Sequence, residues 1–251
     1  MSFALNGRAG VSTQTRERIM DAARDLGWQP SHRARSLSVS RAFACGLVLA
    51  RAPELIGADP FFPSFIAGVE TMLAPAGYAL VLQVVSDEAA EEAGYRRLAG
   101  EGRVDGVFLS DLRAGDARIG LLAELGLPAV TLNRPDVPSP FPAVCVDDRV
   151  GVREAVLHLV DLGHTRIAHV SGPAKFLHSR SRRDAWADAL HEVGVQPGPL
   201  VVSDFTAAGG AAATTQLLDR AEPPTAIVYA NDVMAIAGLG IAHQRGLSVP
   251  A

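Results

Sequence analysis

Five short segments of the sequence place aromatic, amide, carboxylate and guanidinium side chains directly after strand-like runs. In an open parallel sheet, ligands bind in the crevice beyond the carboxyl ends of the strands. If two such sheets face each other, all of these segments line one cleft that could hold a polar small molecule. Any one segment alone is more often a turn or a helix cap, but together they favour a ligand site. The segments are residues 59–62, 133–134, 172–182, 204–206 and 231–232.

Strand-like runs and amphipathic helical segments alternate along the chain from Phe43 onward. Apolar runs separated by helices are typical of parallel strands that are buried on both faces of a sheet. Residues 134–142 break the alternation with four prolines and no helical pattern, so a second α/β unit should begin near Gly151. The expected strands are 42–50, 78–86, 105–110, 129–133, 143–147, 166–172, 199–204 and 226–231, and the expected helices are 63–76, 88–101, 116–125, 149–162, 180–193, 208–220 and 232–245.

The first 41 residues differ from the rest of the chain in charge. They contain seven arginines and three acidic residues, a net charge of +4, so the remainder carries −8 of the total of −4. Residues 10–30 are typical of one helix, capped by Ser12 or Thr13 and ended by Gly27, and such a helix is too short to be stable alone. A basic arm on an acidic body indicates a polyanionic partner, with an ordinary solvated helical face as the alternative.

Known catalytic and metal-binding motifs are absent from the sequence. It has no glycine-rich dinucleotide fingerprint after the first strand, no P-loop, no nucleophile elbow and no zinc-protease motif. His164 and His169 lie five residues apart across a turn into a strand, which is poor spacing for metal ligands, so we expect a turn residue and a core residue. We therefore expect no enzymatic activity, no cofactor and no metal site.

Cysteine usage and hydropathy indicate the cellular compartment. Cys45 and Cys145 both fall in apolar strand-like runs, which favours buried free thiols over a disulfide. No signal segment opens the chain, and no apolar stretch reaches the length of about 18 residues that a membrane span needs. We expect a cytoplasmic protein that does not cross a membrane.

Six segments along the chain carry one known pattern: LNGRAGVSTQTRERIMDAARDLGWQP (5–30), ARSL (34–37), DPFFPSFIAGVE (59–70), GRVDGVFL (102–109), VDDRVGVREAVLHLVDLGHTRIAHVSGP (146–173) and PTAIVYANDVMAIAGLGIAHQRGLSVP (224–250). Together they resemble the LacI/GalR (lactose repressor) family of transcriptional regulators, over essentially the whole chain. The resemblance implies an α/β fold with two Rossmann-like parallel-sheet subdomains of the periplasmic-binding-protein type, preceded by a partial helix-turn-helix headpiece and a hinge. The implied boundaries are 1–30 for the headpiece, 31–42 for the hinge, 43–150 for the N-terminal subdomain and 151–251 for the C-terminal one.

The resemblance assigns a DNA-binding role to the hinge, residues 31–42 (the basic segment). In the family, paired hinge helices of a dimer enter the minor groove, and a leucine from each wedges between base pairs; Leu37 matches that leucine. An apolar wedge that kinks the duplex, flanked by cations that offset backbone charge, is sound physics for such a contact. The alternative is that Leu37 simply packs onto the body. The implied DNA-contacting residues are Asn6, Ser31, Arg33, Ala34, Arg35 and Leu37.

The resemblance also maps the family's effector contacts onto the strand-end segments. Arg182 matches the arginine of an R-x-x-G-aromatic motif, written here R-R-D-A-W, with Ala185 where glycine is usual. Aromatic faces combined with an arginine and an amide suit a polyol, so a sugar is the favoured effector over a purine or another metabolite. The implied effector-binding residues are Phe61, Phe62, Asn133, Phe176, His178, Arg182, Phe205, Asn231 and Asp232.

The implied function is a DNA-binding transcriptional regulator, a repressor in the commoner case, whose affinity for double-stranded operator DNA is controlled by the effector. The implied assembly is a homodimer with a pseudo-palindromic operator. Relative to the family pattern, the sequence begins within the recognition helix and stops before the final strands, so we expect truncation at both ends and weak operator binding. The alternatives are a ligand-binding sensor without DNA binding and a periplasmic-type sugar-binding protein.

Overall fold

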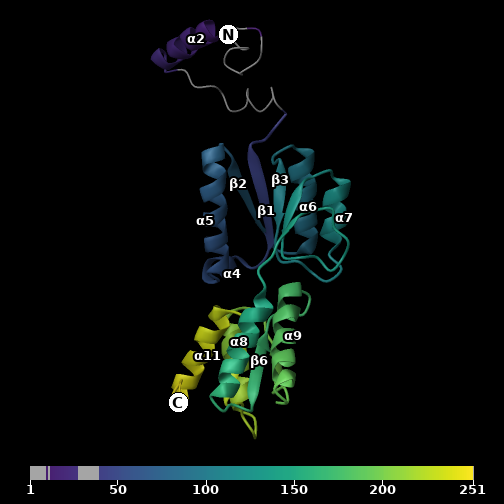
Figure 1. Ribbon diagram of the computed structural model, residues 1–251, viewed down its shortest axis with the longest axis vertical. Helices are drawn as coiled ribbons and strands as arrows, with labels where there is room; N and C mark the ends of the chain where they lie inside the picture. Colours follow the sequence, from purple (N-terminus) through teal and green to yellow (C-terminus); the bar gives the residue numbers. More distant parts are fainter. Residues whose placement is uncertain (1–9, 11, 28–39, 251) are drawn as a thin grey trace.

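The computed structural model describes residues 10, 12–27 and 40–250 (Figure 1). Helix α2 (Thr13–Asp25) is the predicted N-terminal helix, and the Ser12 side chain caps it by accepting a hydrogen bond from the Thr15 amide. Gly27, in the left-handed conformation at φ 62°, follows its end. The residues expected to contact DNA lie outside the described residues: Asn6, Ser31, Arg33, Ala34, Arg35 and Leu37.

The first subdomain is a five-stranded parallel sheet between two layers of helices. The strand order is β2-β1-β3-β4-β5, and Figure 1 shows α5 on one face with α6 and α7 on the other. Helix α4 was not expected, and it begins at Pro53, where the fixed proline φ suits a first helical turn; the expected helix 63–76 is observed as α5 followed by η1. The elements are β1 (Ala44–Ala50), α4 (Pro53–Ala58), α5 (Phe61–Leu73), η1 (Ala74–Ala76), β2 (Ala79–Val85), α6 (Glu88–Gly100), β3 (Gly106–Leu109), α7 (Ala117–Glu124), β4 (Ala129–Leu132) and β5 (Ala143–Val144).

The second subdomain is a three-stranded parallel sheet in the order β7-β6-β8, again with helices packed on both of its faces. The two parallel sheets confirm the predicted fold class, and every expected strand and helix from Phe43 onward is present. Helix α8 starts at Asp148, three residues before the expected start of the second unit. The elements are α8 (Asp148–Asp161), β6 (Ile167–Ser171), α9 (Leu177–Glu192), β7 (Leu200–Val202), α10 (Ala207–Leu218), β8 (Ala226–Tyr229) and α11 (Asp232–Gln244).

The two subdomains touch through apolar packing and through backbone hydrogen bonds. Leu55 of α4 packs into the core of the second subdomain beside Phe176 and Met234. The segment after β3 pairs with the start of α9: the Ala114 amide donates to the Lys175 carbonyl at 3.0 Å, and the Leu177 amide donates to the Leu112 carbonyl at 2.9 Å. These contacts fix the loops of one sheet against the loops of the other.

Buried charges tie α6 and α7 to the end of β3. Glu91 is 1% exposed and accepts hydrogen bonds at 2.6 Å from both Arg118 and Arg113. Arg118 also donates to the Asp116 carboxylate at 2.7 Å and to the Ser110 carbonyl at 3.1 Å. Each buried charge has a partner of opposite charge, although the buried Arg113 Nε has no hydrogen-bond partner among the described residues, and the network holds the loop that follows β3 in place.

The cysteines and histidines test two predictions made from the sequence. Both cysteines are free, but Cys145 is exposed and Cys45 is only half-buried, so the prediction of two buried thiols is wrong. Strand β5 is just two residues long, so Cys145 falls beyond the sheet. His164 lies in a turn and pairs with Thr225, and His169 is fully buried and stacks on Trp186, so both histidine predictions are confirmed. Among the described residues, no helix is both long and apolar enough to cross a membrane.

Candidate ligand-binding site

A cavity of about 940 Å³ lies where the strand ends of the two sheets face each other. Both subdomains contribute to its walls, as expected for loops beyond the carboxyl ends of parallel strands. Phe176 alone of the nine sequence-predicted residues does not line it, and instead packs behind His178. The predicted residues that line the cavity are Phe61, Phe62, Asn133, His178, Arg182, Phe205, Asn231 and Asp232.

Stacked rings form the wall contributed by the second subdomain. The rings of His178, Phe176 and Phe205 form a triangle: the His178 centroid lies 5.4 Å from each of the other two, and those two lie 6.3 Å apart. Phe205 adopts a left-handed backbone conformation at φ 71°, and its ring lies directly on Gly172 at the end of β6. A Cβ atom on Gly172 would stand 2.0 Å from the Phe205 ring, so only glycine permits this packing.

Arg51 and Asp111 form a bidentate ion pair that the sequence analysis missed. Arg51 follows β1 and Asp111 follows β3, and the guanidinium donates to both carboxylate oxygens at 2.7 and 2.9 Å. The Arg51 guanidinium also lies 4.1 Å from the centroid of the Phe176 ring, so a cation of one subdomain covers an aromatic face of the other. The strand-end rule that nominated the other segments applies equally to these two positions.

Burial and Arg51 set the protonation states of Asp111 and His178, which face the same cavity. Burial alone would raise the pKa of Asp111, but the hydrogen bonds and positive charge of Arg51 prevail and lower it. Burial lowers the pKa of His178 to about 4, against an opposing effect of the Asp111 carboxylate. At neutral pH the cavity therefore presents an ionised Asp111 and a neutral imidazole.

Arg182 on α9 is held by contacts to two other elements of the second subdomain. Its Nε donates to Asp148 at 2.9 Å, at the start of α8, and its Nη1 donates to the Ala230 carbonyl at 2.7 Å, beyond β8. The side chain remains about a quarter exposed, at 27%. Arg182 can thus donate its remaining N–H groups to a ligand without losing its orientation.

Asn231 links the two walls. It caps α11 by accepting from the Met234 amide at 3.2 Å, and its Nδ2 donates to the Phe205 carbonyl at 3.1 Å. The same Nδ2 donates across the cleft to Asp59 of the first subdomain at 3.2 Å. Asp232, in the first turn of α11, is exposed and also lines the cavity.

The remaining predicted residues sit on the first subdomain. Phe61 is 51% exposed at the start of α5, whereas Phe62 is 5% exposed and packs into the core. Asn133 adopts φ 75° after β4 and accepts a hydrogen bond from the Val146 amide at 3.3 Å. Asp111, Asn133 and Phe205 are thus three non-glycine residues with left-handed backbones around one cavity, and such strain is concentrated at functional sites.

Comparison with known proteins agrees with this architecture. Residues 44–251 match the family model described as periplasmic binding proteins and sugar binding domain of LacI family. The transcriptional regulator AglR of Rhizobium meliloti (strain 1021) is 35% identical over 99% of this chain and 70% of its own length. The regulator CelR of Thermobifida fusca is 34% identical over 100% of this chain and 74% of its own length.

Solved structures give the same result. A complex of the transcriptional regulator CelR with cellobiose superimposes with a TM-score of 0.77 at 32% identity, over 99% of this chain and 75% of that one. The lac repressor dimer bound to operator and the anti-inducer ONPF superimposes with a TM-score of 0.81 at 27% identity, over 99% of this chain and 74% of that one.

Two facing parallel-sheet subdomains with a cavity between their strand ends define a two-lobed ligand-binding protein of the periplasmic-binding-protein type. The family match and the identity to the relatives also establish the family of the chain. It belongs to the LacI family of transcriptional regulators. The chain is therefore a DNA-binding regulator of transcription that is controlled by a ligand.

Proposed function

We propose that the effector is an uncharged sugar bound between the two subdomains, in contact with the eight predicted residues that line the cavity and with Arg51 and Asp111, while Phe176 supports His178 from behind. The observation that carries the proposal is the composition of the cavity: stacked rings on one wall and oriented hydrogen-bonding groups on both. Sugar rings offer apolar faces for aromatic side chains and hydroxyls that both donate and accept hydrogen bonds. A relative of known structure was solved with cellobiose.

The charges of the cavity support an uncharged ligand over an anionic one. Its two guanidinium groups, Arg51 and Arg182, are each already paired with a carboxylate. Three further carboxylates line the same space, on Asp59, Asp147 and Asp232. A sugar phosphate would bring negative charge into a wall that is already net negative, and this would weaken its binding.

Calorimetric titration tests the effector class. Cellobiose and a set of other neutral mono- and disaccharides would be titrated into the wild-type chain and into an Arg182→Ala variant. We expect binding of at least one neutral sugar, weakened about tenfold or more in the variant because a charge-assisted hydrogen bond is lost. Binding of a purine nucleoside, with no sugar bound, would refute the sugar assignment.

We propose that the DNA contact is made by a homodimer through the basic segment. Two-fold symmetry of a homodimer matches a pseudo-palindromic operator. Arg33 and Arg35 would neutralise phosphates while Leu37 inserts between base pairs in the minor groove. The sugar would act by its different affinity for the dimers that bind DNA and for those that do not.

Replacement of Leu37 by alanine tests this contact. We expect weaker binding to a selected operator duplex and an almost unchanged sugar affinity, because the wedge contacts only DNA. Equal loss of both affinities would show that Leu37 packs on the body instead. We further propose that the protein acts in the cytoplasm without catalysis of its own, as the regulator names of its relatives suggest.

A further inference from the structure

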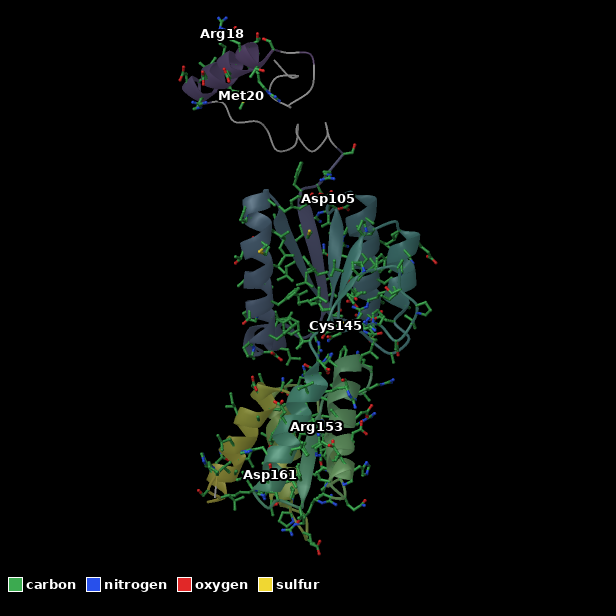
Figure 2. All side chains as sticks on the ribbon, viewed as in Figure 1. Arg18, Met20, Asp105, Cys145, Arg153 and Asp161 are labelled. Carbon is green, nitrogen blue, oxygen red and sulfur yellow. The ribbon has the colours of Figure 1, made fainter. Side chains whose placement is uncertain are left out.

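Asp105 lies at the end of the first sheet that is opposite the cavity, where the chain arriving from the basic segment enters β1 (Figure 2). Its carboxylate accepts hydrogen bonds from two consecutive backbone amides, with Oδ1 2.7 Å from the Ala42 nitrogen and Oδ2 2.9 Å from the Phe43 nitrogen. In the other direction, the Asp105 amide donates to the Ala44 carbonyl at 2.8 Å. The side chain and backbone of one residue therefore hold three successive residues of the incoming chain.

The backbone held by Asp105 has an unusual conformation. Phe43 adopts φ 53° and Ser40 adopts φ 52°, in the left-handed region that bulky side chains avoid. Such strain persists only where surrounding contacts determine the conformation. The Phe43 carbonyl accepts from the Ala79 amide at 3.0 Å, and its ring packs edge-on against Tyr78 with centroids 5.7 Å apart. These contacts, with the two bonds to Asp105, set the direction in which the chain leaves the body.

The strands attached to this clamp lead to the cavity. Asp105 directly precedes β3, and β3 pairs in parallel with β1 in the register Cys45 to Gly106. At their other ends the same two strands are joined by the Arg51–Asp111 ion pair, which lines the ligand cavity. One pair of neighbouring strands thus carries a carboxylate clamp at the ligand end and another at the end toward the basic segment.

We propose that Asp105 is a positioning residue for DNA binding: it fixes residues 42 and 43, and so aims the preceding basic segment at DNA. The inference rests on the proposed DNA contact of that segment. A shift of β1 against β3, caused at the cavity, would be passed to the backbone of Ala42 and Phe43 through the two hydrogen bonds of Asp105. Loss of the clamp should therefore weaken DNA binding and leave the ligand cavity intact.

An Asp105→Asn variant tests the proposal, with Asp136→Asn as the matched control. Asparagine keeps the size of the side chain, but its NH₂ group would face one of the two backbone amides, and two donors cannot bond. Asp136 also accepts from a backbone amide of the first subdomain, that of Gly115 at 2.9 Å, far from the incoming chain in sequence. Because Asp136 uses one oxygen only, the asparagine oxygen can still accept from Gly115, so the control makes the same substitution and removes the same charge without the loss of a backbone hydrogen bond.

Four quantities would be measured on both variants and on the wild-type chain. The first is the rate of hydrogen exchange of the peptide that contains residues 42 and 43, and the second is the thermal midpoint of unfolding. The third is the affinity for a DNA duplex that the wild-type chain selects from a random-sequence pool. The fourth is the affinity for cellobiose, or for whichever neutral sugar binds the wild-type chain. For Asp105→Asn we expect faster exchange at this peptide and a loss of duplex affinity of about tenfold. We expect sugar affinity to stay within about twofold of wild type, and Asp136→Asn to match wild type in both affinities.

The outcomes separate this proposal from the proposed function. If the wild-type chain binds no duplex, the DNA contact fails, and exchange at residues 42 and 43 decides alone whether the clamp exists. Wild-type duplex affinity in Asp105→Asn would overturn the positioning role, as would parallel losses of duplex and sugar affinity. Should Asp105→Asn fail to fold, Asp105→Glu, which keeps the charge but displaces the carboxylate by one methylene, must show the same split between the two affinities.

Discussion

The two walls of the cavity are held differently, although each contains both rings and an ion pair: Phe61 stacks on Phe65 in the first, and Arg182 pairs with Asp148 in the second. The first subdomain holds its wall with ion pairs, Arg51 with Asp111 at the surface of the cavity and Glu91 with Arg118 beneath it. The second subdomain holds its wall with stacked rings and a helix-capping amide, His178 against Phe205 and Asn231 at the start of α11. Ion pairs fix the orientation of the side chains that bind the ligand, whereas packed rings fix the shape of the cavity. The two walls should therefore respond differently to pH and to substitution.

The largest effect is expected where the charged wall loses its buried support. Glu91→Ala would leave Arg113 without a buried carboxylate and Arg118 with Asp116 alone, and should destabilise the fold by about 3–5 kcal/mol, the cost of breaking a buried pair. Glu92→Ala, next in sequence, removes an exposed pair with Arg96 and should cost at most about 0.5 kcal/mol. Urea unfolding of both variants measures this contrast. Equal, small losses would show that the network does not support the wall.

Acidification should weaken the second subdomain, whose core contains His169, before it weakens the carboxylate pairs of the first. Burial lowers the pKa of His169 to about 4, so its folded form favours the neutral ring, whereas the unfolded chain takes up a proton near pH 6.5. The contribution of His169 to the free energy of unfolding is therefore fully present above pH 6.5 and falls by about 3 kcal/mol as the pH drops to 4. His169→Phe should remove the His169 share of this slope in unfolding experiments across that range, while His178, whose pKa burial also lowers to about 4, keeps its own share. An unchanged slope would place the pH dependence elsewhere.

The carboxylates of the first subdomain respond in a lower range of pH. Burial alone would raise the pKa of Asp111 and Asp116, but the hydrogen bonds and charges of Arg51 and Arg118 prevail and lower it in the folded state. Their contribution is present above the ordinary aspartate value of about 3.9 and is lost as the pH falls through the lower folded pKa. Between pH 6.5 and 4, therefore, the free energy of unfolding should fall because of the buried histidines, and the aspartates of the first subdomain should not contribute to the change.

The packing of the aromatic wall gives an intermediate effect. Gly172→Ala would push the Phe205 ring out of place, and such overpacking typically costs about 1–3 kcal/mol, which we expect mainly as lost sugar affinity. Gly151→Ala is the matched control, because Gly151 also lines the cavity but has open space where a Cβ would be. Calorimetric titration of a bound sugar into both variants distinguishes them. Equal affinities would mean that the Phe205 ring does not contact the ligand.

The smallest effect is expected for the contact that joins the two walls. A double-mutant cycle with Asp59→Ala and Asn231→Ala isolates their hydrogen bond from the loss of the α11 cap. We expect an interaction energy of about 0.5–1.5 kcal/mol in thermal or urea unfolding. A value of zero would mean that this bond does not couple the subdomains.

The sequence predicts the fold of this chain well because its strands are largely apolar, even where they are partly exposed, as in β2 and β7. Each core strand is a continuous apolar run, and helical segments of ordinary length separate them, so period and length identify every strand of both sheets. Strand β5 is the exception in length. Val144 is 62% exposed and Val146 is 74% exposed, so an apolar run that was read as a five-residue strand is mostly surface.

The site was predicted only in part. Strand-end segments with an obvious aromatic, amide or arginine were found, since position in the pattern is enough to nominate them. Arg51 and Asp111 were missed because their significance lies in their pairing, and 60 residues separate them in the chain. Short α4 was missed because six residues carry too little periodicity to show a helix.

The central claim is that ligand binding between the walls controls DNA binding, and one measurement tests it most directly. The affinity of the wild-type chain for a selected operator duplex would be measured without sugar and with a saturating concentration of the neutral sugar that it binds. The account predicts a change of about 5- to 150-fold, with the same factor when sugar affinity is measured with and without the duplex. Two affinities that are both measurable and do not affect each other would contradict it.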